Sequence, residues 1–235
     1  MRVSLFVTCI VDQLFPNVGI AMAKVLERAG CELEFREGQT CCGQPAFNTG
    51  YRDEARTVAE HFLDVFEGAE HIVVPSGSCA SMIAHHFAEL LPADKRAHAV
   101  ETQVWEFSQF LTDVLKIDDF GAALDATATY HDGCHSLREM KIKAGPRKLL
   151  EKVRGLKLIE LDPPEECCGF GGTFSVKFPE ISGSMVRSKV DAIERTGAST
   201  VISTDPSCLM QIQGALTRAG SKVRTMHLAE VLASR

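Results

Sequence analysis

Several patterns that would assign this chain of 235 residues to a common functional class are missing from it. No apolar run approaches the ~18 residues that a membrane-spanning helix needs. No basic run of five or more residues occurs, and 25 basic against 31 acidic side chains leave a net charge of −6. That balance disfavours binding to nucleic acid or to an anionic membrane, because both attract a basic surface. With 45% hydrophobic and 24% charged residues, the composition is that of an ordinary globular protein.

The common motifs of electron-transfer enzymes are also missing. The sequence has no G-x-G-x-x-G dinucleotide fingerprint, no flavin fingerprint and no ferredoxin C-x₂-C-x₂-C run. Its apolar N-terminal stretch stops at Asp12 with no small-residue cleavage site after it, so we interpret it as a strand rather than a signal peptide. The chain is therefore predicted to be cytoplasmic. In that compartment thiols stay reduced, and grouped cysteines indicate metal or redox chemistry more often than disulfides.

Eight of the nine cysteines form one pattern that occurs twice. In each half a single cysteine precedes a Cys-Cys-Gly triplet and another single cysteine follows it. Cys9 and Cys134 are 125 residues apart, the two triplets 126, and Cys79 and Cys208 129, so the halves are nearly in register. Four thiols per half suit a zinc ion or an iron–sulfur cluster. We call Cys9, Cys41, Cys42 and Cys79 the first cysteine set, and Cys134, Cys167, Cys168 and Cys208 the second cysteine set.

Short apolar runs alternate with segments of helical period, which predicts an α/β fold of βαβ units with largely parallel sheets. The repeat divides this fold into two pseudo-equivalent lobes, residues 1–120 and 121–235, that pack closely because no linker-like segment separates them. The pattern predicts strands at 3–8, 32–36, 72–75, 127–131, 156–161, 200–204 and 223–226, and helices at 17–29, 52–67, 79–91, 104–115, 146–153, 180–195, 206–218 and 228–233.

The cysteines of both sets follow predicted strands, directly or after a short loop. The carboxyl ends of parallel strands lie at one edge of a sheet, where open α/β folds bind their ligands. Thiols that are 30 to 40 residues apart in the sequence are therefore expected to converge at that edge. Cys31 has no counterpart in the second half, and we predict a structural role for it.

The Cys-Cys-Gly triplets indicate what the thiols bind. Adjacent side chains normally diverge, so a vicinal pair suits a group with several irons better than one small ion. The glycines after the pairs, Gly43 and Gly169, free the backbone to approach this group and to direct N–H donors at its sulfur atoms. Gly171 and Gly172 extend this cradle in the second half. We therefore expect the second site to be the more redox-active of the two.

With these residues in place, the sequence resembles the cysteine-rich CCG family. The resemblance covers essentially the whole chain and rests on FVTC at 6–9, CCGQPA at 41–46, GSC at 77–79, CCGFGGTFSVK at 167–177 and MHLAEVL at 226–232. The family includes the heterodisulfide reductase B subunit and the iron–sulfur subunits of glycolate oxidase and anaerobic glycerol-3-phosphate dehydrogenase. This chain looks most like the small stand-alone members that serve lactate utilisation.

The resemblance implies an iron–sulfur subunit of a complex that oxidises L-lactate to pyruvate, with one [4Fe–4S] cluster per lobe and with B- and C-type partner subunits. Because the chain lacks a hydride acceptor, we expect it to oxidise lactate only with those partners. One departure matters. In the heterodisulfide reductase B subunit each last cysteine belongs to a CxxC and five thiolates hold a noncubane cluster, whereas Met82 and Gln211 stand at those places here. The noncubane type therefore stays open beside a conventional four-thiolate cluster or a labile one.

Histidine is a further candidate ligand, because it binds both iron and zinc in proteins. His131 and His135 flank Cys134, and His227 follows the last predicted strand. The first-half counterparts of His131 and His135 are Phe6 and Ile10, so we predict structural roles for these histidines. The other polar candidates are predicted to be surface residues: His85, His86, Arg138, Lys141 and Lys177.

Two other functions fit the cysteine pattern. In the first, four cysteines per lobe bind zinc and hold a scaffold together, although zinc seldom needs a vicinal pair. In the second, a Cys-Cys pair reacts directly as a thiol–disulfide component like heterodisulfide reductase. We rank that function last, because a disulfide between adjacent cysteines is strained.

Overall fold

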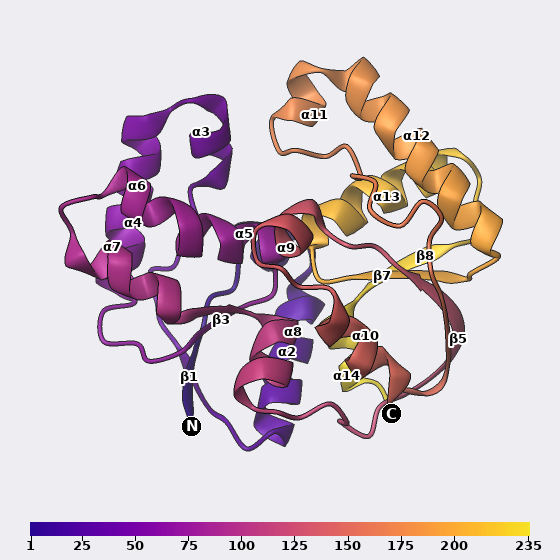
Figure 1. Ribbon diagram of the computed structural model, residues 1–235, viewed down its shortest axis with the longest axis horizontal. Coiled ribbons are helices and arrows are strands. Elements are labelled where there is room, and N and C mark those ends of the chain that lie inside the picture. Colours follow the sequence, from indigo (N-terminus) through magenta and orange to yellow (C-terminus); the bar gives the residue numbers. More distant parts are fainter.

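The computed structural model describes residues 1–235, whose eight strands form two four-stranded sheets. The strand order is β2-β1-β3-β4 in the first sheet and β6-β5-β7-β8 in the second, and every pairing is parallel. The second sheet thus repeats the first, which confirms the predicted α/β fold of two lobes (Figure 1). The strands are β1 Arg2–Leu5, β2 Glu32–Phe35, β3 Ile72–Val74, β4 Val104–Glu106, β5 Ala123–Tyr130, β6 Arg154–Ile159, β7 Thr200–Ser203 and β8 Arg224–His227.

Helices connect the strands and cover the sheets, and none combines the length and apolar composition that crossing a bilayer requires. In the first lobe they are α1 Cys9–Leu14, α2 Pro16–Arg28, α3 Gln44–Thr49, α4 Arg52–Val65, α5 Gly77–Ser81, the π-helix η1 Met82–His86, α6 Phe87–Leu90, α7 Lys95–Ala99, the 3₁₀-helix η2 Val100–Thr102, α8 Phe107–Gln109 and the π-helix η3 Phe110–Val114. In the second lobe they are α9 Cys134–Arg138, α10 Ala144–Glu151, α11 Phe174–Lys177, α12 Pro179–Thr196, α13 Pro206–Arg218 and α14 Leu228–Ala233.

One predicted helix is wrong at its start. Residues 104–106 form the strand β4, which pairs with β3, and the helical segment begins only at Phe107. A strand of three residues is too short to show alternation, so its apolar residues merge with the helical period of the segment that follows. The equivalent part of the second lobe does divide as predicted, into β8 and α14.

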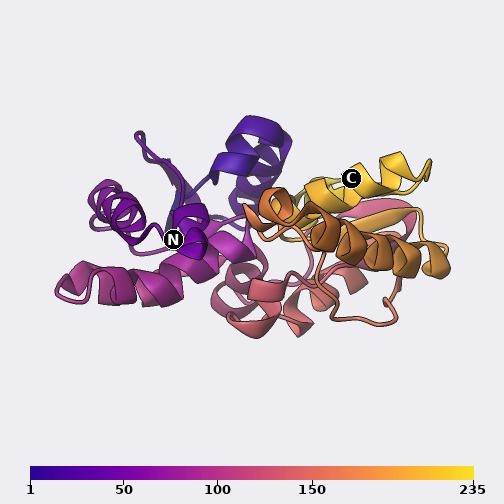
Figure 2. The same cartoon turned by 90° about the horizontal axis from the view of Figure 1, so that it is seen from above.

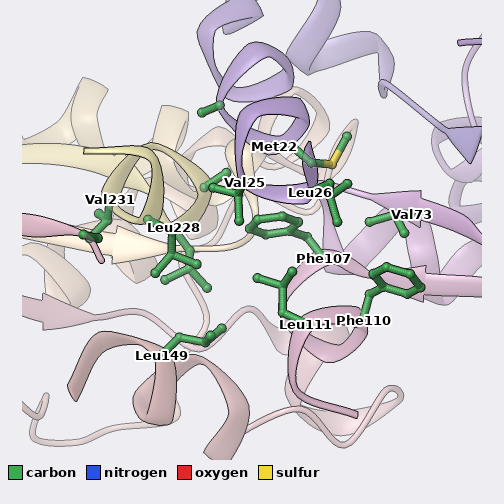
Figure 3. Packing of buried hydrophobic residues seen from close by; sticks show 14 of the residues in the cluster. Met22, Val25, Leu26, Val73, Phe107, Phe110, Leu111, Leu149, Leu228 and Val231 are labelled. Carbon is green, nitrogen blue, oxygen red and sulfur yellow. The ribbon is translucent and has the colours of Figure 1, made fainter. Parts of the chain in front are cut away.

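A central hydrophobic core of 22 buried residues joins the two lobes. Helix α2 of the first lobe packs against α14 of the second, and α10 of the second lobe packs against α8 of the first. In each pair, the helix after the first strand of one lobe contacts the helix after the last strand of the other lobe. Phe107 and Leu111 lie close to Leu149 and Leu228 in this core (Figure 3). Each lobe also has an outer core of its own, with 19 and 10 buried residues. The lobes therefore lie side by side along the long axis and share a continuous apolar interior (Figure 2).

Candidate metal centre

All eight cysteines of the two sets line a single cavity between the lobes. Its empty space totals about 810 Å³, part of it open to solvent. The cavity wall comes from α1, α3 and α5 of the first lobe and from α9, α13 and the loop before α11 of the second. None of the cysteines forms a disulfide. The repeat in the sequence thus brings two sets of four thiols to one place.

The strand order explains this convergence. In each sheet the order reverses between the first and third strands, and open α/β sheets bind ligands in the crevice at such a point. Cys9 begins α1 after β1, and Cys79 lies in α5 after β3. Cys134 and Cys208 have the same positions after β5 and β7. These cysteines lie in the first turns of their helices.

Within each set the thiols contact one another. Hydrogen bonds with the thiols of Cys42 and Cys9 lower the pKa of Cys41 to about 3. The same hydrogen bond, together with burial, raises the pKa of Cys9 above its usual range. In the second set, hydrogen bonds with Cys134 and Cys168 lower the pKa of Cys167 to about 2. Each set therefore holds one thiolate stabilised by neighbouring thiol donors, which is a starting point for metal binding.

The glycine after each Cys-Cys pair has the same conformation and contact in both lobes. Gly43 and Gly169 have φ angles of 85° and 81°. Their N–H groups donate to the Sγ atoms of Cys41 and Cys167, each at 3.4 Å. A Cβ atom at Gly169 would lie 2.8 Å from the carbonyl oxygen of Ser182, so a larger residue does not fit there without movement. Gly171 and Gly172 also have positive φ angles, 54° and 62°, and line the cavity.

His131 departs from the plain structural role that its position suggested. It follows β5 and is fully buried, yet neither ring nitrogen has a hydrogen-bond partner. A ring nitrogen and the Sγ atoms of Cys168 and Cys208 all lie within 4.8 Å of one another. Burial is the main reason that the pKa of His131 falls to about 3, so the ring is neutral and has a free lone pair. This imidazole can act as an additional metal ligand in the second set.

The other two histidines behave differently. His227 is fully buried, and its Nδ1 accepts from Ala229 N at 3.0 Å at the start of α14. Its Nε2 must therefore carry the proton, which it donates to the carbonyl oxygen of Pro75 at 3.1 Å across the lobe junction. His135 lines the cavity, with Nδ1 3.5 Å from Cys134 Sγ. His227 thus has a structural role, whereas His135 faces the thiols.

Two polar residues of the site did not stand out in the sequence. Asp205 is buried and lies between the two cysteine sets, where its carboxylate accepts from Ser78 N of the other lobe at 3.0 Å and from Ser207 Oγ at 2.6 Å. Lys189 of α12 is fully buried and lies near Cys167 and Cys168 of the second cysteine set. The run Asp-Pro-Ser-Cys at 205–208 is an N-cap signal that indicates Asp205, but nothing local indicates Lys189.

The remaining candidates lie outside the cavity. Cys31 is buried in the central core, away from both cysteine sets. The side chains that were considered as surface residues do not line the cavity either, and all but the half-buried His86 are exposed: His85, His86, Arg138, Lys141 and Lys177.

A family model for the cysteine-rich CCG domain matches residues 3–84 and 128–213, which contain both cysteine sets. This chain belongs to the CCG family. It is 50% identical over 239 residues to Lactate utilization protein A of Bacillus cytotoxicus, with 100% of both chains covered. The protein of the same name from Geobacillus sp. is 47% identical and Lactate utilization protein A 2 of Bacillus mycoides 49% identical, again over 100% of both chains.

A solved structure shares the fold of this CCG-family chain. It is a hypothetical protein from Helicobacter pylori, with a TM-score of 0.68 and 12% sequence identity. The match covers 98% of this chain and 48% of that one, so this chain spans about half the length of the Helicobacter pylori protein. At this identity the match shows the fold alone.

Proposed function

We propose that this chain is a cytoplasmic iron–sulfur electron-transfer subunit that works with B- and C-type partner subunits in the oxidation of L-lactate to pyruvate. The observation that carries the proposal is the single cavity lined by two sets of four thiols. The names of full-length relatives at 47–50% identity support the role in lactate utilisation. A protein of this kind exchanges electrons with partners and needs no hydride acceptor of its own.

The residues of each set fit an iron–sulfur cluster. Four thiols that already contact one another supply the usual number of ligands. The N–H groups of Gly43 and Gly169 point at sulfur, which is one of the ways in which proteins adjust the potential of such a cluster. When bound, the clusters would supply reversible one-electron exchange. Because both sets line one cavity, two bound clusters would be close enough to exchange electrons.

Analysis of iron and acid-labile sulfide after strictly anaerobic purification tests this proposal. We expect a brown protein with both elements present, and a Cys168→Ser variant with about half of each. Cys31→Ser is the matched control, because Cys31 is a buried thiol outside the cavity and should leave both contents unchanged. Sulfide-free protein, or equal losses in the two variants, would contradict the assignment.

The partner requirement has its own test. The loaded chain alone should not reduce an electron acceptor with lactate, whereas mixing it with its B- and C-type subunits should start turnover. Lactate oxidation by the isolated chain would overturn the relay role and would place a catalytic site within this cavity.

Zinc is the second candidate, and one observation favours it. The mutually close donors His131, Cys168 and Cys208 form a compact group of the kind that binds a single tetrahedral ion. A zinc protein would be colourless and free of acid-labile sulfide, so the same elemental analysis separates the two candidates.

A further inference from the structure

The two lobes differ at one pair of buried positions beside the cysteine sets. Phe6 and His131 are equivalent, because each lies three residues before the first cysteine of its set. The buried positions of α4 and α12 have the same spacing, which makes Phe62 equivalent to Lys189. These positions are Ala55, Ala59, Phe62 and Leu63 in α4 and Phe66 directly after it, and Ser182, Val186, Lys189, Val190 and Ile193 in α12, where Ala192 is also buried.

In the first lobe this pair is aromatic and well packed. The rings of Phe6 and Phe62 lie edge to face with their centroids 5.0 Å apart, and both side chains belong to the outer core. In the second lobe the same pair consists of His131 and Lys189, both with 0% of their surface exposed. Neither the ammonium of Lys189 nor the imidazole of His131 has a hydrogen-bond partner. One lobe therefore has two unpaired polar groups where the other has an aromatic contact.

An unpaired ammonium in a protein interior is costly. The penalty is several kcal/mol per ion, and proteins normally offset it with a nearby negative charge. Two carboxylates lie in the neighbourhood, but Asp132 is bound to Arg147 at 2.8 Å and Glu166 forms no ion pair with Lys189. The remaining negative group is the thiolate of Cys167, which is hydrogen-bonded to the thiol of Cys168 in the second cysteine set. The arrangement thus places a buried cation near the second cysteine set, whereas no buried lysine or arginine lies near the first.

We propose that Lys189 is the counter-charge of the group held by the second cysteine set, and that it gives this centre a higher reduction potential than the first. The inference rests on the proposed function. Reduction adds a negative charge to the centre, and a buried cation stabilises the charged product most strongly where the dielectric constant is low. The first centre has Phe6 and Phe62 in place of that cation, and apolar surroundings disfavour added charge. Electrons entering the protein would therefore collect on the second centre.

A redox titration followed by EPR, on full-length protein purified anaerobically, tests the inference. In wild type we expect two centres with separate midpoint potentials. Lys189→Met keeps the length of the buried side chain and removes its charge, so it should lower only the higher potential. We expect this midpoint potential to fall by at least about 59 mV. For a one-electron couple, that shift is a tenfold change in the ratio of oxidised to reduced centre at a fixed applied potential. Arg187→Met is the matched control, since it removes an exposed positive charge from the same helix and should move neither potential.

A measurement on the metal-free protein distinguishes a counter-charge from a structural lysine. In the metal-free protein no hydrogen bond or ion pair offsets the desolvation of the buried ammonium, so Lys189→Met should unfold at the same urea concentration as wild type or at a higher one. A lower urea midpoint, or unchanged potentials in the loaded variant, would overturn the inference while leaving two iron–sulfur centres in place. Wild-type protein without iron and sulfide would instead refute the proposed function and this inference with it.

Discussion

The junction between the lobes makes a sharp prediction about His227. This fully buried imidazole is the N-cap of α14 and donates to the Pro75 carbonyl of the other lobe. Replacing it with alanine removes a helix cap, which costs about 1 kcal/mol. It also leaves the buried carbonyl of Pro75 without a partner, which costs about 1–3 kcal/mol more. We therefore expect His227→Ala to lower the free energy of unfolding by about 2–4 kcal/mol, a large share of the ~5–15 kcal/mol of a typical domain.

Urea unfolding of the reduced, metal-free protein, followed by far-UV circular dichroism at pH 7.5, measures this effect. The chain offers a matched control in His98, whose Nε2 also lies 3.1 Å from a proline carbonyl, that of Pro92. His98 is exposed, so water can replace its hydrogen bond. His98→Ala should change the stability by no more than about 0.5 kcal/mol. Equal losses in the two variants would show that the contact across the junction adds nothing, and would refute this reasoning.

Two further predictions concern a buried carboxyl group and a glycine. Burial raises the pKa of Glu106 to about 7, so its folded form keeps a proton that the unfolded chain releases above its usual pKa of 4.5. Its contribution to stability is thus fully present below pH 4.5 and is lost by about pH 7, which lowers the free energy of unfolding by about 3 kcal/mol. Urea unfolding of wild type and Glu106→Gln across this pH range should show that only wild type loses this stability. Parallel pH profiles of the two proteins would contradict the prediction. Gly169→Ala should destabilise the protein more than Gly197→Ala, because both glycines have positive φ angles but only at Gly169 would a Cβ lie within 3 Å of backbone. Gly169→Ala should also lower the metal content of the protein. A smaller loss of stability in Gly169→Ala than in Gly197→Ala would refute the close approach.

The alternation of short apolar runs with segments of helical period was enough to predict the α/β architecture, and the repeated cysteine pattern predicted its two lobes. Helices α13 and α14 begin and end where the sequence placed them. For α13 the reason is local, since Pro206 stands at its first position and fixes the start. The strand β4 was missed because three residues show no period of their own.

The sharing of one cavity by both cysteine sets could not be read from the sequence. It depends on how α2 and α14 pack across the junction, which is a tertiary property. Lys189 was missed for a related reason. The sequence pattern of an amphipathic helix assigns a single lysine to the polar face. Only the structure, in which the buried positions of α12 have the same spacing as those of α4, shows that Lys189 is buried. His131 was predicted to have a structural role, because its burial without hydrogen-bond partners appears only in three dimensions.

The packing of α14 against α2 also has a consequence for the order of events during synthesis. The ribosome makes α2 early, yet Leu228, Val231 and Leu232, which complete its surroundings, are translated after every other element of the fold. Until then the central core lacks one of its walls. The central core shared by the two lobes is complete only after α14 has docked. Under the proposed function, insertion of both metal groups is thus a step for the finished chain.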